Sequence, residues 1–232
     1  MTATLDTAPI LAVYTQLETM HAWRGWHWWP DAEPFEVIVG SILVQNTNWV
    51  NVERAIAQLK AADALTPEAM TLLTDGTLEK LVRPSGQYRQ KTKKLRAFLA
   101  LADSHGGLAP LLALSPSELR AILLATWGIG EETADCIVVY ASRQPAFAID
   151  AYTRRIFSRL GIGPSPAASY AEWQRYFTEA LPRDRDLWAR YHALIVMHAK
   201  HLCRKLRPLC GQCVLLERCP GSPLSAANSW PS

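Results

Sequence analysis

The stretch "TWGIGEETADCIVVYASRQPAFAIDAYTRRIF", residues 126–157, decides the fold. Its glycines Gly128 and Gly130 interrupt an apolar helical pattern that resumes directly after them. Glycine tolerates the backbone conformations of tight turns and lets a second backbone approach closely. The helix after such a turn presents N–H groups that have no partner inside the helix and can bind a phosphate. The pattern predicts two helices joined by a phosphate-binding hairpin, Gly128-Ile129-Gly130; an ordinary turn between helices is the alternative.

Two acidic residues, Glu131 and Glu132, follow the hairpin, at a place where a DNA-binding turn would be expected to carry positive charge. Backbone amides supply the hydrogen-bond donors of such a phosphate site, so the site needs no lysine. Neither carboxylate therefore has to face a phosphate group.

Asp150 begins the next helical segment, "DAYTRRIFSRLG", which ends at Gly161. Aspartate is a favoured N-cap residue because its carboxylate accepts hydrogen bonds from N–H groups of the first helical turn. A carboxylate can also stabilise a developing positive charge or accept a proton from water. The residues alone leave both roles open.

The rest of the chain also reads as helices. Residues 34–47 are almost continuously apolar and predict a buried helix. Residues 87–102 predict a basic amphipathic helix, and residues 115–125 begin with a capping box in which Ser115 precedes Glu118 by three positions. Helical patterns also cover residues 51–59, 170–181 and 186–203. Because no alternating strand pattern or repeat is evident, the sequence predicts an all-α protein.

The composition is that of a soluble globular protein, with 232 residues that are 49% hydrophobic and 19% charged. The net charge is only +3, but basic residues gather between Leu81 and Ala102 and between Lys200 and Arg207. Such stretches suit a phosphate backbone, or they form a solvated helix face. No signal peptide or membrane-spanning run is evident. We therefore expect a cytoplasmic protein whose cysteines do not form disulfides.

Four cysteines with the spacing C-x6-C-x2-C-x5-C lie within 17 residues, namely Cys203, Cys210, Cys213 and Cys219. In a reducing compartment, thiolates this close together indicate a metal site. Four thiolates suit a zinc ion and also a 4Fe-4S cluster, and the spacing leaves both open. Cys136 lies apart in an apolar helix, where it reads as a small buried residue.

Three features occur in this order along the chain: the hairpin, an aspartate about twenty residues later, and a four-cysteine tail. With this combination the chain resembles the helix-hairpin-helix, Gly/Pro-Asp superfamily of DNA glycosylases, in its endonuclease III-like branch. The resemblance covers roughly residues 25–220. It implies a six-helix barrel over residues 25–143 and a cluster domain built from residues 1–24 and 144–232. It also implies that the four cysteines bind a 4Fe-4S cluster. The expected partner is double-stranded DNA containing a damaged base, bound by a monomer.

Three segments take roles from this resemblance. "IDAYTRR" matches the segment with the family's essential aspartate, which implies that Asp150 is catalytic. "ILVQNTN" matches the segment whose glutamine fills the gap left by a flipped nucleotide, which implies that role for Gln45. "PSGQYRQKTKKL" matches the loop and helix that press on the opposite strand, with Ser85, Gly86 and Gln87 at the tip.

The sequence departs from the family at Glu132, because bifunctional members carry there the lysine of Gly-x-Gly-x-Lys that attacks the sugar. A carboxylate cannot form the Schiff base that β-elimination needs. The resemblance therefore implies a monofunctional hydrolase that leaves an abasic site. Trp127 also replaces the proline that is common before the first hairpin glycine.

The aromatic residues favour one branch of the superfamily. "WWP" at 28–30, "QNTNW" at 45–49 and "GQYRQKTKKL" at 86–95 resemble the 3-methyladenine glycosylases, in which aromatic residues from these places line the base pocket. The candidates here are Trp28, Trp29 and Trp49, with core packing as the alternative. An alkylated purine is positively charged, so tryptophan faces and a carboxylate at Glu132 would favour it. The alternative for Glu132 is a place in solvent.

Other functions stay open. One is a glycosylase with lyase activity on oxidised pyrimidines, although no substitute lysine stands at a matching position; a mismatch-specific glycosylase is another. A non-catalytic protein that binds damaged or bent DNA would need the hairpin and the basic helix but not Asp150. A zinc-stabilised DNA-binding module would lack the visible absorbance of an iron–sulfur protein.

Overall fold

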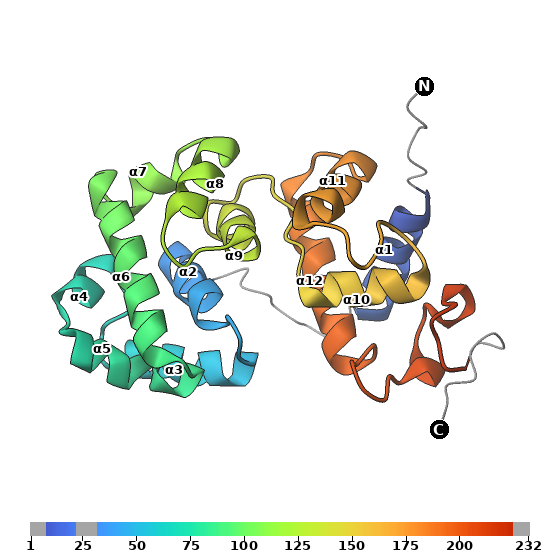
Figure 1. Cartoon of the computed structure of the whole chain (residues 1–232), viewed down its shortest axis with the longest axis horizontal. Coiled ribbons are helices and arrows are strands. Elements are labelled where there is room, and N and C mark those ends of the chain that lie inside the picture. Colours follow the sequence, from blue (N-terminus) through green and yellow to red (C-terminus); the bar gives the residue numbers. More distant parts are fainter. Residues whose placement is uncertain (1–7, 22–31, 225–232) are drawn as a thin grey trace. The chain divides into compact units, whose positions relative to one another are not determined.

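The structure is a computed structural model that describes residues 8–21 and 32–224 (Figure 1). Every regular element in these two ranges is a helix, which confirms the all-α prediction. The chain divides into two compact units. The continuous unit is Trp29–Ala146, and the chain-end unit joins Met1–Trp28 to Phe147–Ser232.

The boundaries between the two units therefore fall after residues 28 and 146 of the chain, whereas boundaries after residues 24 and 143 are expected from the sequence. The difference at the second boundary has a packing reason. Phe147 and Ile149 are buried in the core of the chain-end unit, and the ring of Phe147 stacks on that of Phe177 with centroids 4.4 Å apart. The segment before Asp150 thus belongs to the same unit as the helix that Asp150 begins.

The continuous unit is built around α2 (Pro34–Leu43), in which every residue but Pro34 and Glu36 is buried. This confirms the buried helix, but the helix stops four residues before the expected end at residue 47. Asn46 takes a left-handed conformation with φ 55°, which ends the helix, and Asn48 caps the next one. The other helices are α3 (Trp49–Ala61), α4 (Pro67–Leu72), α5 (Asp75–Val82), α6 (Tyr88–Ser104), α7 (Leu108–Leu112), α8 (Pro116–Ala125) and α9 (Glu131–Cys136), with a 3₁₀ turn η2 (Arg83–Ser85) and a π-helical turn η3 (Ile137–Ala141).

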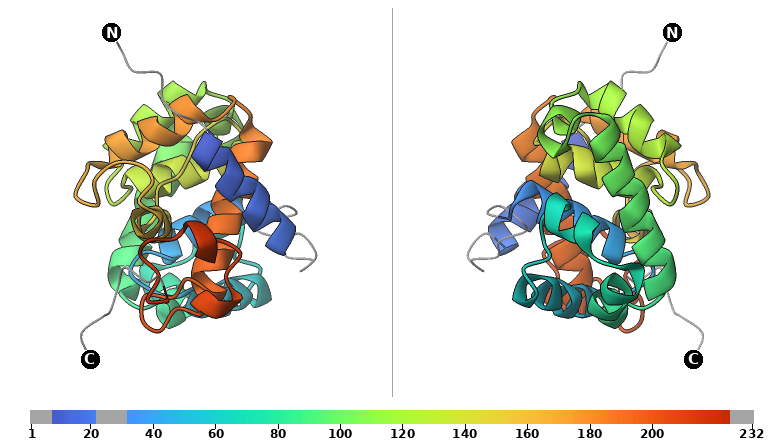
Figure 2. Two further views of the ribbon diagram at one scale, coloured as in Figure 1. Left: turned by 90° about the vertical axis from the view of Figure 1, so that its right-hand side faces the viewer. Right: turned by 90° about the vertical axis from the view of Figure 1, so that its left-hand side faces the viewer.

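The chain-end unit pairs helices from the two ends of the sequence. It contains α1 (Ala8–His21), α10 (Ala151–Leu160), α11 (Tyr170–Ala180), α12 (Arg185–His201) and the 3₁₀ turns η4 (Cys210–Gln212) and η5 (Leu216–Arg218). Helix α1 lies against α12 (Figure 2), and the Tyr191 hydroxyl donates to the Ile10 carbonyl at 2.7 Å. The rings of Phe147, Phe157, Phe177 and Tyr191 form an aromatic core.

Local helix signals in the sequence are confirmed. The capping box of Ser115 and Glu118 opens α8 with both reciprocal hydrogen bonds present. Asp150 caps α10, and Gly161 ends it in the left-handed conformation with φ 66°. In residues 8–21 and 32–224, no helix combines the length and apolar character that crossing a membrane requires.

Candidate functional site

The hairpin between α8 and α9 has the turn geometry that its glycines predict. Gly128 has φ +84°, a conformation that side chains with a Cβ rarely adopt. The Ile129 N–H donates to the Thr126 carbonyl at 3.2 Å, and the Ile129 side chain is buried. Gly130 is the N-cap of α9. The first N–H groups of α9 therefore follow directly on the turn, as a backbone phosphate site requires.

An arginine pairs with two of the acidic residues that follow the hairpin. Arg120 of α8 donates from Nε to Asp135 Oδ1 at 2.8 Å and from Nη2 to Asp135 Oδ2 at 3.3 Å. Its Nη2 also lies 3.8 Å from Glu131 Oε1. Asp135 is fully buried, whereas Glu132 is exposed. One arginine thus ties the two hairpin helices together through acidic partners.

Gln45 lies against the hairpin rather than standing free after α2. Its Nε2 donates to the Gly128 carbonyl at 3.2 Å and to Thr133 Oγ1 at 3.0 Å. Its Oε1 accepts a hydrogen bond from Lys94 Nζ of α6. The structure therefore joins the three segments expected to touch DNA, namely the "ILVQNTN" segment, the hairpin and the basic helix, at one side-chain amide.

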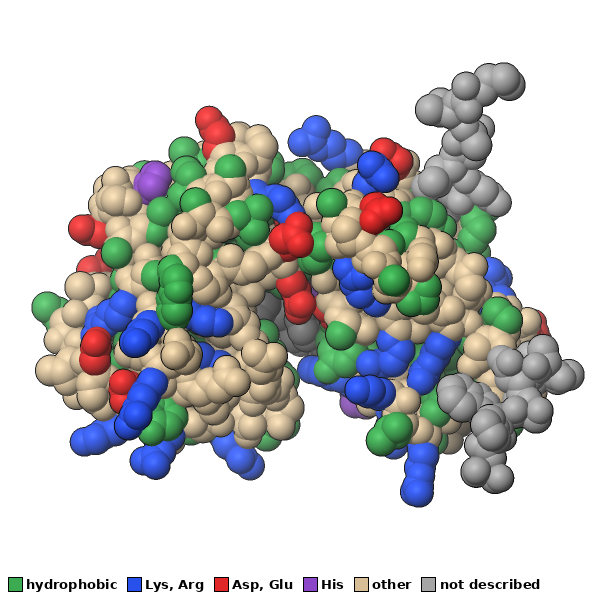
Figure 3. Space-filling view, in the orientation of Figure 1, with side chains coloured by type: hydrophobic (Ala, Val, Ile, Leu, Met, Phe, Trp, Pro, Cys, Tyr) green, Lys and Arg blue, Asp and Glu red, His purple; other side chains and the backbone are tan. Residues whose placement is uncertain are grey.

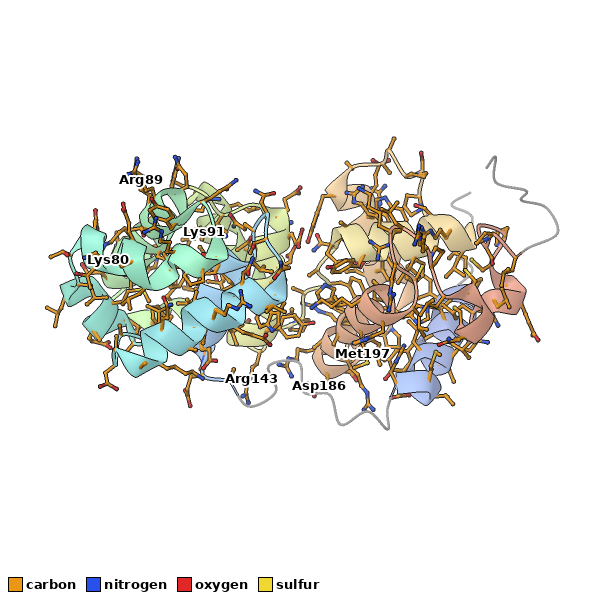
Figure 4. The ribbon with its side chains drawn as sticks, turned by 90° about the horizontal axis from the view of Figure 1, so that it is seen from below. Lys80, Arg89, Lys91, Arg143, Asp186 and Met197 are labelled. Carbon is orange, nitrogen blue, oxygen red and sulfur yellow. The ribbon has the colours of Figure 1, made fainter. Side chains whose placement is uncertain are left out.

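The loop before α6 differs from the expected tip. Ser85 is fully buried, and its hydroxyl donates to the Val82 carbonyl at 2.7 Å. Gly86 and Gln87 are exposed and have φ 69° and 45°, so these two residues form the tip. Lys91 is buried below it and donates to the Ser85 carbonyl, while the nearby Arg89 is exposed (Figure 4).

Basic side chains gather on the continuous unit where α3 and α5 lie (Figure 3). The basic helix α6 contributes only part of its charge to the surface, since Arg89 and Lys93 are exposed but Lys91 is not. Burial, followed by the charge of Lys94, lowers the pKa of Lys91 to about 8. Arg96 donates to the carbonyls of residues 70 and 73 and to Asp75, so its role is structural.

The aromatic candidates fall in different surroundings. Trp49 is half-buried at the first position of α3. Trp28 and Trp29 lie outside the described residues. Trp127, which stands before the first hairpin glycine, is 55% exposed. Trp173 and Trp188 are buried in the chain-end unit, so these two of the nine tryptophans are core residues.

Asp150 is a buried carboxylate at the N-terminus of α10, only 7% exposed. Its Oδ1 accepts the Thr153 N–H at 2.6 Å, and its Oδ2 lies 3.6 Å from His192 Nε2. Burial acts to raise the pKa of Asp150, but the hydrogen bonds and charge that His192 and Thr153 supply outweigh it. The pKa therefore lies below its usual value, and the carboxylate is ionised at neutral pH.

His192 is a site residue that the sequence patterns did not single out. It lies on α12, 3% exposed, 42 positions after the aspartate that it faces. The available signal was a histidine inside the otherwise apolar run of residues 191–197. Periodicity could show that this position is buried, but not that a carboxylate lies opposite.

The four cysteines of the tail line one cavity of about 30 Å³, together with Arg159, Leu202, Pro208 and Leu216. Two N–H groups and one histidine ring nitrogen lie close to the sulfur atoms. Arg159 Nη1 lies 3.1 Å from Cys203 Sγ, and the Leu215 N–H and His198 Nε2 each lie 3.4 Å from Cys213 Sγ. Hydrogen-bond donors around sulfur are the surroundings that thiolate ligands need.

The cysteine positions also bear on which metal group fits. A single zinc ion draws its sulfurs to about 2.3 Å from one point. In the described part of the chain, no group of three or more His, Cys, Asp or Glu side chains converges in a way that could hold one metal ion. A 4Fe-4S cluster instead binds each thiolate through a different iron, so its four ligands surround a cavity. Four cysteines that line one cavity are compatible with such a cluster.

Comparison with known proteins identifies the class. Residues 39–183 match the family described as HhH-GPD superfamily base excision DNA repair protein. The match covers more than half of the chain, and the chain belongs to this family. It is accordingly a DNA glycosylase of base excision repair, of the endonuclease III-like type.

Individual relatives agree with this class. A protein of Methanocaldococcus jannaschii that is named as a candidate DNA repair glycosylase is 42% identical over 196 residues, which cover 83% of this chain and 88% of the relative. Endonuclease III of Thermotoga maritima is 28% identical over 82% of this chain and 84% of its own length.

Solved structures agree as well. An endonuclease III–DNA complex has a TM-score of 0.79 at 23% identity, covering 94% of this chain and 96% of the other, which confirms the all-helical glycosylase fold. The 3-methyladenine DNA glycosylase of H. pylori, bound to 1,N6-ethenoadenine, has a TM-score of 0.72 at 26% identity, covering 82% and 96%.

Proposed function

We propose that the protein is a monofunctional glycosylase that hydrolyses the N-glycosidic bond of a flipped alkylated purine such as 3-methyladenine, with Asp150 as the catalytic residue. The observation that carries this proposal is the state of Asp150. It is buried, oriented by the Thr153 N–H and kept ionised beside His192. A carboxylate that is largely shielded from water acts strongly on charge that develops next to it.

In this proposal, named residues carry out or support each step of the reaction. Cleavage of the N-glycosidic bond gives the sugar oxocarbenium character, which the carboxylate of Asp150 stabilises. The same carboxylate accepts a proton from the attacking water. His192 positions the carboxylate and favours its charged form. Thr153 holds the second oxygen, so the side chain keeps one orientation.

The absence of lyase chemistry follows from Glu132. A carboxylate stands at the family's lysine position and cannot form a Schiff base with the sugar. Hydrolysis would then release the base and leave the DNA strand intact at an abasic site.

An alkylated purine is the proposed substrate because it is cationic. A cation over a tryptophan face gains about 2 kcal/mol when desolvated. Trp49 is a half-buried candidate for such a face, and Trp28 and Trp29 are expected to contribute. The exposed carboxylate of Glu132 adds a favourable field if it faces the base. The 26% identity with the H. pylori 3-methyladenine glycosylase supports this branch.

DNA contacts are proposed for three places. The backbone N–H groups after Gly128, Ile129 and Gly130 bind a phosphate. Gln45 fills the gap left by the extruded nucleotide, since unstacking a base costs a few kcal/mol and the opened duplex must be kept from closing. Gly86 and Gln87 form the exposed tip that meets the opposite strand.

The cysteine cavity is proposed to hold a 4Fe-4S cluster. Cys203, Cys210, Cys213 and Cys219 would be its ligands, and the N–H donors toward the sulfurs fit thiolate ligation. When bound, the cluster would cross-link the short loops between the four cysteines of the tail. It thereby supports a loop whose exposed residues include Arg204, Lys205 and Arg207, the basic residues proposed to lie near phosphate.

The test is base release from methylated duplex DNA, scored separately from strand cleavage. Asp150→Asn should lower release at least about 100-fold, the lower range of general acid–base effects, while asparagine still caps α10. Asp184→Asn is the matched control, because Asp184 is the exposed N-cap of α12 and its change should have no effect. Full activity in Asp150→Asn would disprove the catalytic assignment.

A lyase for oxidised pyrimidines is the second candidate, favoured by the endonuclease III relatives and by the Lys94 amine at the hairpin. Borohydride trapping on DNA with an abasic site distinguishes the two. We expect no covalent adduct with the wild type and no nicking at thymine glycol. An adduct that disappears in Lys94→Met would establish the second candidate.

A further inference from the structure

We propose that Lys94 is a positioning residue that fixes the side chain of Gln45 against the hairpin and thereby prepares it to fill the gap in an opened duplex. This inference rests on the proposed role of Gln45. Lys94 is not one of the residues that the family resemblance assigns. The contacts that carry it all lie within the continuous unit.

The amide of Gln45 is fixed by three contacts that require one orientation. Its Nε2 donates to the Gly128 carbonyl at 3.2 Å and to Thr133 Oγ1 at 3.0 Å. Its Oε1 accepts from Lys94 Nζ. A flipped amide would turn its NH₂ group toward an ammonium, which can only donate. Lys94 therefore selects the orientation in which Gln45 can donate to the hairpin.

The route of the Lys94 side chain explains why residue 128 is a glycine. A Cβ on Gly128 would lie 2.5 Å from Lys94 Cγ and 2.9 Å from its Cδ. The methylene groups of Lys94 thus pass directly over the Gly128 Cα before the ammonium reaches Gln45. This close packing holds the lysine stem, so the ammonium is delivered to one place.

The neighbours of Lys94 on α6 differ from it. Lys93 is exposed, and Lys91 is buried under the loop with its amine on the Ser85 carbonyl. Lys94 is half-buried with its amine on Gln45. Three lysines within four positions therefore have three different surroundings, and the stem of Lys94 packs on the hairpin residue Gly128. A general attraction to phosphate does not require that contact.

Pre-ordering has a physical advantage for a side chain that must enter a transient gap. A free glutamine loses rotamer freedom when it enters the duplex, whereas one that is already held loses less. A hydrogen bond from a charged donor contributes more than a neutral one. The same hairpin that binds the phosphate then holds the glutamine, so docking of the hairpin also delivers Gln45 to the duplex.

The experiment is a double-mutant cycle on the full-length protein with Lys94→Met, Gln45→Ala and the combination. Base extrusion is followed by the fluorescence of 2-aminopurine beside a non-hydrolysable 2′-fluoro nucleotide, and base release is measured separately on methylated duplex. Lys93→Met is the matched control, because it removes the same charge from the same helix at an exposed position. Circular dichroism of each variant verifies folding.

Lys94→Met should slow extrusion roughly 10-fold when Gln45 is present, the effect of losing one hydrogen bond from a charged group. It should change extrusion less than about two-fold in the Gln45→Ala background, since the lysine acts through the glutamine. Lys94→Arg, which keeps a charged donor, should recover part of the rate. Lys93→Met measures the effect of losing one charge from the same helix, and that effect should be smaller than that of Lys94→Met.

Equal effects of Lys94→Met in both backgrounds, or an effect no larger than that of Lys93→Met, would overturn the proposal. An absent extrusion signal in the wild type would overturn it as well. Base release by the wild type is a separate readout. Its absence would contradict the proposed glycosylase activity on alkylated purines while leaving the coupling between the two residues measurable by extrusion.

Discussion

Replacement of Arg120 by methionine should destabilise the protein strongly, because it removes the guanidinium from a buried carboxylate. Asp135 is 0% exposed, and both of its oxygens accept from Arg120, at 2.8 and 3.3 Å. Glu131, the other partner of this arginine, is 47% exposed and can turn to water. The loss of stability therefore comes mainly from the buried charge of Asp135, which loses the guanidinium beside it.

The magnitude follows from the surroundings of the pair. Removing one partner of a buried ion pair costs about 3–5 kcal/mol. The Arg120 side chain is 28% exposed, so water reaches part of the site and the lower end, about 3 kcal/mol, applies. For a chain of this size each kcal/mol shifts the midpoint of thermal unfolding by roughly 2–4 °C. The expected fall in Tm is about 6–12 °C.

The assay is thermal unfolding of the variants at neutral pH, followed by circular dichroism. Arg120→Met is compared with Arg120→Met/Asp135→Asn, which also removes the buried charge and should regain most of the lost Tm. Arg185→Met is the control, because Arg185 pairs with the exposed Asp186 and such surface pairs contribute less than about 1 kcal/mol. A fall in Arg120→Met no larger than in the control, or a double variant less stable than the single one, would refute the reasoning.

Three further predictions concern the site. His192→Gln should move the acid limb of the pH–rate profile for base release to higher pH, because His192 holds down the pKa of Asp150, the proposed catalytic residue, and its loss lets that carboxylate protonate at higher pH; an unmoved limb contradicts this role. Gly128→Ala should lower the Tm for two reasons: φ is +84°, and the new Cβ would meet Lys94 Cγ at 2.5 Å. Adding Lys94→Ala to this variant should restore, in the same melting assay, only the part of the Tm that the clash removed. Cys213→Ser should reduce iron content and visible absorbance of the purified protein, whereas Cys136→Ser should leave both unchanged.

Features that depend on neighbouring residues were predictable from the sequence. The capping box of Ser115 and Glu118, the N-cap at Asp150 and the helix end at Gly161 each involve residues a few positions apart. Their physical chemistry is local, so a short window contains all the partners. The hairpin and the buried helix α2 were predictable for the same reason.

Contacts between distant elements were not predictable. His192 lies 42 positions from the carboxylate it faces, and Lys94 lies 49 positions from Gln45. Periodicity shows that a face is buried but not which element covers it. Ser85 was expected at the exposed loop tip, yet it is buried because its hydroxyl and carbonyl both bond inside the unit, the latter to Lys91. Such pairings arise only when the helices pack.

The way the chain-end unit joins both termini sets an order of events during synthesis. A ribosome adds about 5–20 residues per second, so roughly 10–30 s pass between the making of α1 and the making of Tyr191. Throughout that interval the apolar stripe of Ile10, Val13 and Leu17 has no α12 to cover it. The continuous unit can assemble meanwhile from its own residues. A nascent chain released before α12 would thus carry a finished hairpin and an uncovered α1, which makes the interval between the synthesis of these two helices the period when the protein most needs protection from aggregation.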